Sequence, residues 1–401
     1  MKTITKTIDI NINNSLCNTD NLFFDIETTG FSRTACFCYL IGVAYIEKEH
    51  FTITQWLAES ESEEPVLIQT FSEFLKNFSS LTHFNGDSFD IPFLKKRATI
   101  HNIQMCFDNI RSIDLYKHAK GLKSLLRLES YNQTSVEHFL GIHRDDVYTG
   151  GELIKVYKEY IKNGSNGAQH DKDEHLLLLH NYDDICGLIK VSSIISYNNI
   201  TNKRITYKGI DYTPDVNIKH NSSNSNPNNA AYITLSFSLP ETIPSSILLR
   251  DEDYVLRAEH STIKFRLPVI TDTLKFFYKN YKDYYYLPYE DTAIHKSVAA
   301  YVDSECKIKA TKETCYTKKY GTYIMLPSYS GDLPVFKKDY NEQNVYLILD
   351  SEPEKKDMSG YNTDTIKNML PMDIIHEAAY AIITFFYKRT VHYTHNQDPY
   401  S

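Results

Sequence analysis

The chain has 401 residues and a formal net charge of −8, and its 42% hydrophobic and 23% charged residues exclude fibrous and wholly disordered proteins while predicting about two domains. No apolar run approaches the roughly 18 to 20 residues that span a bilayer, the N-terminus is too polar for a secretory signal, and the seven Cys lack disulfide-like spacing. We therefore expect a cytoplasmic protein with reduced thiols and no membrane association. The negative net charge argues against a protein that coats nucleic acid through bulk electrostatic attraction, but it does not exclude an enzyme that acts on nucleic acid.

The first half alternates strands and helices. Three strands that should form an antiparallel meander are predicted at 22–26, 38–45 and 51–57. A helix over 64–78, with its apolar residues on one face, leads to a short strand at 81–84. Further helices are predicted at 91–98, 115–128, 135–140, 152–161 and 173–195. This order predicts an α/β domain at 20–198, in which helices flank a mixed sheet.

The composition changes after residue 198, and the tract at 220–229 is almost purely polar. We expect an Asn/Ser-rich linker at 199–230. Beyond it, strands are predicted at 233–238, 247–250, 254–258 and 263–269, with helices at 291–302 and 371–387. These elements predict a smaller, β-rich α+β accessory domain of unknown function at 231–401. Aromatic and Lys residues alternate at 276–286, as in a stacking platform for single strands or, equally, a half-buried strand.

Two acids stand close together in the first predicted strand. Asp25 and Glu27 are two residues apart, so strand alternation places both carboxylates on one face. Burying two like charges beside apolar neighbours is costly, and a divalent cation commonly compensates for it. The alternative is that the strand ends at Ile26 and both acids are solvated turn residues.

A third acid, Asp90, follows a Gly-containing turn at a predicted strand-to-helix junction. By its position alone, a residue that caps a helix N-terminus is the favoured interpretation. In the long helix at 173–195, Asp184 falls on an apolar stripe one turn after His180. A carboxylate embedded in such a stripe needs a partner, whereas a buried His is often a satisfied core residue.

Together these residues form a set similar to that of the DEDD exonuclease superfamily, which has the RNase H-like fold. The nearer resemblance is to bacterial YprB-like predicted exonucleases and to the proofreading domains of family B polymerases. It covers roughly Leu22 to Tyr197. The matching motifs are Phe24-Asp-Ile-Glu-Thr-Thr-Gly30, Asn85-Gly-Asp-Ser-Phe-Asp-Ile-Pro-Phe-Leu94, Leu140-Gly-Ile-His-Arg144 and His180-Asn-Tyr-Asp-Asp184.

The resemblance implies a site for two Mg²⁺ or Mn²⁺ ions. Asp25 would bridge the ions, Glu27 and Asp184 would hold the ion that activates water, and Asp90 would hold the second. His180 would orient the water or accept its proton. The polymerase-like branch usually has Tyr at the position of His180, and Asp183 is the adjacent alternative to Asp184 as the last metal ligand.

The implied activity is 3'-to-5' hydrolysis of nucleic acid to nucleoside 5'-monophosphates. The substrate would be a DNA or RNA 3' end, with single strands favoured, while protein partners are not indicated. Thr28, Asn85 and Phe89 are candidate contacts to the terminal nucleotide, although packing and turn formation explain them equally well. The alternatives are a catalytically inactive RNase H-like nucleic-acid-binding or scaffold protein and a structure-selective endonuclease.

Overall fold

The computed structural model describes residues 1–10, 12, 14–144, 148, 150–162, 167–214, 231–329, 331, 333–350 and 370–388. The chain divides into two compact units, which are treated separately below. The first unit comprises Met1–Asn198 with Ile243–Ser245, and the second comprises Asn199–Thr242 with Ser246–Ser401. Among the described helices, none combines the length and the apolar character that crossing a bilayer requires.

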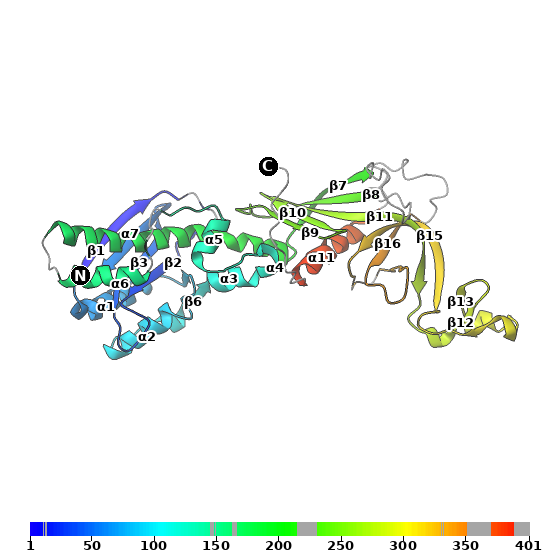
Figure 1. Ribbon diagram of the computed structural model, residues 1–401, viewed down its shortest axis with the longest axis horizontal. Coiled ribbons are helices and arrows are strands. Elements are labelled where there is room, and N and C mark those ends of the chain that lie inside the picture. The colour runs from blue at the N-terminus through cyan, green and yellow to red at the C-terminus, as the bar shows by residue number, and fades with distance from the viewer. Residues whose placement is uncertain are drawn as a thin grey trace. The chain divides into compact units, whose positions relative to one another are not determined.

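The first unit is built on a six-stranded mixed sheet with the strand order β1-β4-β3-β2-β5-β6 (Figure 1). Its strands are β1 (Lys2–Ile8), β2 (Asn21–Thr28), β3 (Cys38–Glu47), β4 (His50–Leu57), β5 (Ser80–His83) and β6 (Arg111–Asp114). The chain runs antiparallel from β2 to β3 to β4, whereas β5 pairs parallel with both β2 and β6. The predicted meander and the predicted mixed sheet are confirmed.

Helices cover both faces of this sheet. The helices of the unit are α1 (Glu64–Leu75), α2 (Asp90–Ile100), α3 (Leu115–Gly121), α4 (Lys123–Leu126), α5 (Gln133–Phe139), α6 (Gly150–Lys162) and α7 (Ala168–Val191), followed by α8 (Asn198–Thr201), which begins at the unit's last residue. Phe24 and Ile26 of β2 belong to the apolar cluster formed with α1 and α2. On the other face, Leu40 of β3 packs with α6 and α7. Strand alternation therefore turns Asp25 and Glu27 toward α7.

Several elements of the first unit differ from the sequence-based predictions. The helix predicted at 115–128 is interrupted at Leu122, and α4 ends at Leu126, before Arg127 with its left-handed φ of 52°. The helix predicted at 173–195 ends as α7 at Val191 and tightens into a 3₁₀ turn at Ser192–Tyr197. Seryl hydroxyls bond to carbonyls three residues earlier in this turn, which favours the tighter helix.

Two strands of the sheet were not predicted. β1 is a polar edge strand that pairs with β4, so its Lys and Thr residues carry no apolar alternation signal. β6 has four residues, which are too few to show the alternation of apolar and polar residues that predicts a strand. The expected start of the first domain at residue 20 therefore leaves out a strand of its sheet.

The second unit is β-rich, as predicted. A seven-stranded sheet contains β7 (Thr206–Pro214), β8 (Ala231–Ser238), β9 (Ile247–Arg250), β10 (Val255–Glu259), β11 (Thr262–Phe277), β15 (Tyr316–Leu326) and β16 (Val345–Asp350). A three-stranded sheet is formed by β12 (Tyr284–Leu287), β13 (Thr292–His295) and β14 (Ile308–Lys309). The helix α11 (Met372–Lys388) carries a run of buried Ala and Ile residues.

The second half also departs from the predictions. The helix predicted at 291–302 is wrong for its first part, because 292–295 form β13 and only Lys296–Ala299 are helical, as α9. The range 199–230, expected as a linker, includes β7, which pairs with β8, while the polar tract at 220–229 lies outside the described residues. Within the aromatic stretch, the rings of Tyr278 and Tyr284 stack on each other at 4.5 Å, so packing within the unit accounts for them.

Candidate active site

The two acids of β2 lie inside the strand. β2 continues through Glu27 to Thr28, so the alternative in which the strand ends at Ile26 is wrong. Glu27 is only 8% exposed and Asp25 is half-buried. Both project from the face opposite the apolar cluster, toward α7.

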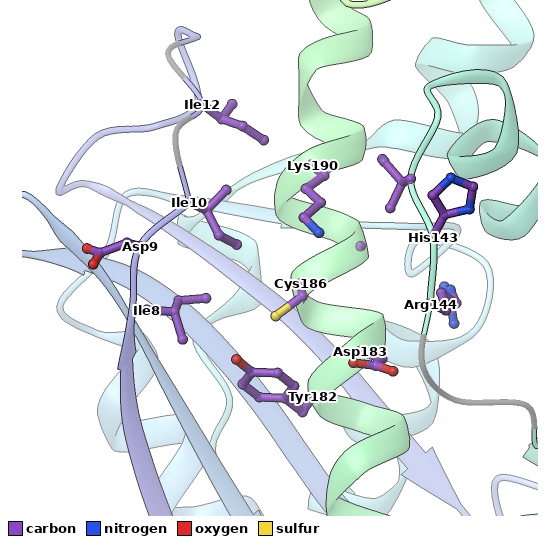
Figure 2. A pocket seen from close by; sticks show the side chains of 12 residues that line it. Ile8, Asp9, Ile10, Ile12, His143, Arg144, Tyr182, Asp183, Cys186 and Lys190 are labelled. Carbon is purple, nitrogen blue, oxygen red and sulfur yellow. The ribbon is translucent and has the colours of Figure 1, made fainter.

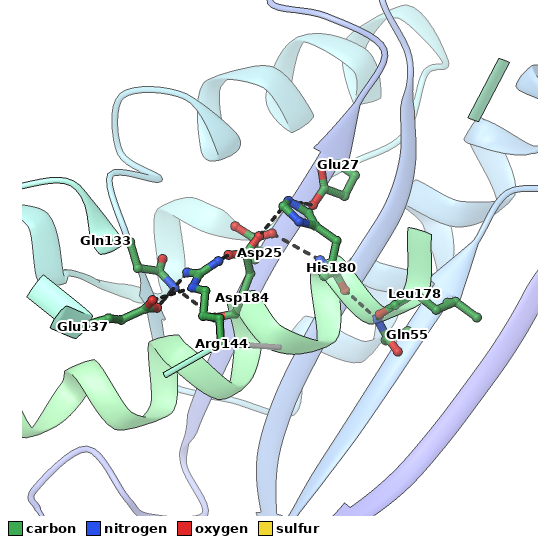
Figure 3. A network of polar contacts seen from close by, with 10 residues as sticks. Asp25, Glu27, Gln55, Gln133, Glu137, Arg144, Leu178, His180 and Asp184 are labelled. Carbon is green, nitrogen blue, oxygen red and sulfur yellow. Dashed lines mark hydrogen bonds and ion pairs between the residues drawn. The ribbon is translucent and has the colours of Figure 1, made fainter. Parts of the chain in front are cut away.

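The helix α7 brings His180 and Asp184 to the same place (Figure 3). The His180 Nε2 atom lies 3.6 Å from Glu27 Oε1 and 3.2 Å from Asp184 Oδ2. One potential ligand atom from each of these three side chains lies within 4.8 Å of the other two. Residues separated by about 150 positions in the chain are thus close enough to share a metal ion.

Asn181 was not identified in the sequence, although it is fully buried beside Asp25. Its Nδ2 donates to Asp25 Oδ2 at 3.2 Å, and its Oδ1 accepts a hydrogen bond from Gln55 Nε2 at 3.0 Å. It approaches β3 at Gly42, where a Cβ atom would lie 2.0 Å from the Asn181 Oδ1. The absence of a side chain at Gly42 therefore allows Asn181 to orient Asp25.

Asp90 is the first residue of α2, and the capping position before it, Phe89, makes no side-chain cap bond. Asp90 is buried, and burial raises the pKa of its carboxyl to about 7, with the Asp114 and Asp184 charges contributing. Hydrogen bonds with its own backbone and with the backbone of Ile26 oppose that shift. The Ile26 bond places the Asp90 carboxyl against β2, between the positions of Asp25 and Glu27.

Asp25, Glu27, Asp90 and Asp184 are called the carboxylate cluster below. Burial raises the pKa of Asp25 well above its usual range, and the charges of Asp184, Glu27 and Asp90 add to the shift. The pKa of Asp184 is also raised, chiefly by burial. Burial and the neighbouring acids therefore disfavour the charged forms of Asp25, Asp90 and Asp184, and a bound cation would favour them. Oxygen donors with excess negative charge fit hard divalent cations such as Mg²⁺ or Mn²⁺.

An arginine outside the predicted set also reaches the carboxylate cluster (Figure 3). Arg144 Nη1 donates to Asp184 Oδ1 at 2.5 Å, and the other side of its guanidinium holds Glu137 of α5. Arg144 ends the third of the matching motifs, Leu140 to Arg144, but no spacing rule assigned a role to it.

Of the three predicted substrate contacts, Thr28 ends β2 beside Glu27, and Asn85 and Phe89 lie in the segment between β5 and Asp90 of α2. Thr28 Oγ1 donates to the Gly30 carbonyl at 3.0 Å, and Asn85 adopts a left-handed φ of 62°, so both residues shape turns. Phe89 packs edge-on against Phe31 with ring centroids 5.9 Å apart. Phe31 was not predicted as a site residue, although its ring is 87% exposed.

A pocket of about 490 Å³ lies between the end of β1, the segment at 142–144 and α7 (Figure 2). Asp183 lines this pocket together with Tyr182 and Lys190, whereas Asp184 faces His180. Arg144 lines the same pocket and also contacts Asp184. Of the two adjacent acids, Asp184 is therefore the one that reaches the carboxylate cluster.

A second group with metal-like spacing, called the turn cluster, consists of His83, Asp87 and Asp114. The Gly86 N–H donates to His83 Nδ1 at 3.0 Å, so the Nε2 atom of neutral His83 carries the proton. This Nε2 lies 2.7 Å from Ser112 Oγ, which it can reach as a donor. His83 in this tautomer has no lone pair available for a metal ion.

Comparison with known proteins supports the fold assignment. Residues 22–196 match the family model of the RNase_H superfamily, so the first unit contains an RNase H-like domain. No curated protein sequence matches the chain.

Solved structures with partial similarity include nucleic-acid enzymes. The family B DNA polymerase from the hyperthermophilic archaeon Pyrobaculum calidifontis is 17% identical, with a TM-score of 0.35 over 44% of this chain and 24% of the polymerase. The chain thus spans about a quarter of that polymerase. An ExoI/SSB-Ct complex is 9% identical, with a TM-score of 0.32 over 92% of this chain and 74% of that one. An SSB/exonuclease I complex with the inhibitor CFAM is 10% identical, with a TM-score of 0.30 over the same shares, 92% and 74%.

Proposed function

We propose that the protein is a metal-dependent 3'-to-5' exonuclease that hydrolyses nucleic-acid phosphodiester bonds and releases nucleoside 5'-monophosphates. One observation carries the proposal: acids from β2, α2 and α7 come close enough for their negative charges to act on Asp25, and ligand atoms of Glu27, His180 and Asp184 lie within 4.8 Å of one another. A scaffold needs no such arrangement, because uncompensated buried carboxylates cost stability.

The carboxylate cluster would hold two Mg²⁺ or Mn²⁺ ions. Asp25 is suited to bridge them, because the charges of Glu27, Asp90 and Asp184 all act on it. Glu27 and Asp184, whose side chains flank His180, would bind one ion, and Asp90 would bind the other. When bound, such a pair of ions stabilises charge on the attacking and departing oxygens of an in-line displacement.

His180 is positioned to handle the proton of the attacking water. Its Nε2 lies 3.6 Å from Glu27 Oε1 and 3.2 Å from Asp184 Oδ2. A neutral imidazole nitrogen at this point would orient the water and accept its proton.

The loops beside the carboxylate cluster would receive the 3' end. Phe31 and Phe89 form an aromatic pair, and the exposed Phe31 ring offers a face on which a base can stack. Arg33 Nη2 donates to the Ser88 carbonyl at 2.9 Å, which ties the two loops that carry these rings together. Stacking on a splayed-out base favours a single-stranded DNA or RNA end, with Thr28 and Asn85 as further contacts.

The proposal is tested by digesting 5'-labelled DNA and RNA oligonucleotides with Mg²⁺ or Mn²⁺. We expect a ladder that shortens from the 3' end for the wild type and none for Asp25→Ala or Asp184→Asn. Asp183→Asn is the matched control, because it makes the same change on the neighbouring residue. A ladder that persists in Asp25→Ala would show that the activity does not arise from this site.

Two further outcomes separate the alternatives. Cleavage of a circular single strand, which has no 3' end, would identify an endonuclease. Binding of oligonucleotides without cleavage in either metal would identify a non-catalytic nucleic-acid-binding protein.

A further inference from the structure

The two oxygens of the Asp184 carboxylate contact different side chains (Figure 3). Its Oδ1 accepts a hydrogen bond from Arg144 Nη1 at 2.5 Å, while its Oδ2 lies 3.2 Å from His180 Nε2. Because a charge-assisted hydrogen bond of this kind is strong, the carboxylate cannot rotate freely about its terminal bond. Oδ2 approaches the same His180 nitrogen as Glu27 Oε1, which lies 3.6 Å from it.

Arg144 is itself held rigidly. Its Nε and Nη2 atoms form a fork on the Glu137 carboxylate, with Nη2 at 2.7 Å from Oε1. The Glu137 side chain is 1% exposed and also accepts a hydrogen bond from Gln133 Nε2 at 3.0 Å. All three guanidinium nitrogens are thus engaged, which leaves Arg144 little capacity to bind a substrate phosphate as well.

The sequence accommodates this arrangement at Gly187. A Cβ atom at this position of α7 would lie 2.1 Å from Glu137 Oε1, so any other residue would displace the glutamate. Glycine inside a helix costs about 1 kcal/mol relative to alanine. Gln133 joins the same contact, because its Nε2 also donates to the Asp184 carbonyl at 3.1 Å. The contact between α5 and α7 is therefore built around the Glu137–Arg144 pair.

We propose that Arg144, anchored by Glu137, is a positioning residue that makes Asp184 a one-oxygen metal ligand through Oδ2. This inference rests on the proposed function, since it concerns the same metal site. Partners that orient metal ligands typically change metal affinity or activity 10- to 100-fold when they are removed.

The test uses the full-length chain and Arg144→Gln combined with Glu137→Gln. This double variant removes the clamp and keeps the net charge of the chain. Because Arg144 contacts Asp184 directly and Glu137 does not, the lost charges alone would strengthen cation binding at Asp184, so weaker binding reports the lost positioning. Binding of Mn²⁺ is measured by electron paramagnetic resonance, and kcat and KM are measured on a 5'-labelled oligonucleotide. We expect the Mn²⁺ Kd to rise and kcat to fall, each about 10-fold or more, with KM unchanged. Thermal unfolding checks that the variant is folded.

A folded double variant with wild-type Mn²⁺ binding and kcat within about twofold would overturn the inference. If the double variant does not fold, Arg144→Lys decides the question, because it keeps the charge and loses the fork. Wild-type Mn²⁺ binding and kcat in Arg144→Lys would then refute a positioning role. The proposed function fails separately, if the wild type neither binds Mn²⁺ nor digests the oligonucleotide.

Discussion

The turn cluster and the carboxylate cluster are two groups of acidic side chains beside the sheet of the first unit. They differ in the direction in which their surroundings shift the pKa values of the acids. In the turn cluster, burial acts to raise the pKa of Asp87, but hydrogen bonds from Lys117 and Ser112 outweigh it and leave the pKa lowered. In the carboxylate cluster, burial and neighbouring acids leave the pKa values of Asp25 and Asp90 raised. Acids with similar spacing thus have opposite pKa shifts at the two places.

The turn cluster has a structural task. Asp114 Oδ1 accepts from the Asn85 N–H at 2.9 Å and from the Tyr116 N–H at 3.0 Å, which fixes the turn after β5 to the start of α3. Asp87 holds the same turn through Ser112 and Lys117. The turn cluster thus supports the loop that delivers Asp90 to β2.

The largest expected effect is the loss of activity in Asp25→Ala. We expect kcat to fall roughly 1,000-fold or more, because the metal ions contribute several kcal/mol of transition-state stabilisation. The melting temperature of the metal-free variant should not fall, since one buried charge is removed from an acidic group. The matched control is Asp108→Ala, an exposed acid paired with Lys95, which should keep wild-type kcat. Equal losses in both variants would contradict the assignment.

The second prediction concerns pH. The pKa of Asp90 is about 7 in the folded protein against 3.8 as its ordinary value, so the unfolded chain releases the proton first as pH rises. The stability of the metal-free protein should therefore fall between about pH 4 and pH 7, by up to a few kcal/mol. Asp87, with its lowered pKa, acts in the opposite direction and loses its contribution only as the pH falls.

This pH dependence is checked by thermal unfolding of the wild type and Asp90→Asn with and without Mg²⁺. The variant should show a flatter stability profile without metal, and Mg²⁺ should raise the wild-type melting temperature more at pH 7.5 than at pH 5. Identical profiles for the two metal-free proteins would remove Asp90 from the carboxylate cluster.

The sequence analysis correctly placed the residues whose positions follow from local strand or helix periodicity. Strand alternation aligned Asp25 with Glu27, and the helical wheel placed Asp184 one turn from His180, as the structure has them. Whether these residues act as predicted remains a prediction. Asn181 and Arg144 were missed because their positions depend on contacts across the fold, with Gly42 of β3 and with Glu137 of α5.

The same reasoning explains the errors in the fold. β1 carries no apolar period because it is an edge strand, and its pairing with β4 follows from tertiary contacts alone. The helix predicted at 291–302 failed because β-branched residues at the start of this range pair with β12. In both places the strand is fixed by pairing with a neighbouring strand, which apolar periodicity does not reveal.

A third prediction tests the support for Asp25. Gly42→Ala would place a Cβ atom 2.0 Å from Asn181 Oδ1, so Asn181 must move and release Asp25. We expect kcat or Mn²⁺ affinity to fall about 10-fold or more. Gly121→Ala is the control, because a Cβ atom there meets nothing within 4 Å. Unchanged metal binding in folded Gly42→Ala would show that Asn181 does not orient Asp25.

The smallest expected effect comes from the turn cluster. Asp87→Ala removes hydrogen bonds with Ser112 and Lys117 and should lower the free energy of unfolding by about 1 kcal/mol. Its Mn²⁺ Kd should equal that of the wild type. Denaturant unfolding and Mn²⁺ titration of the same preparation make the comparison. A weakened Mn²⁺ affinity would mean that the two groups of acids are not independent.

The most direct test of the central claim is anomalous diffraction from crystals soaked in Mn²⁺. We predict two Mn²⁺ peaks about 3.5 to 4 Å apart among the oxygens of the carboxylate cluster. No peak should appear at the turn cluster, where His83 offers no lone pair and Asp87 is already paired. A Mn²⁺ peak at the turn cluster, with none beside Asp25, would contradict the account.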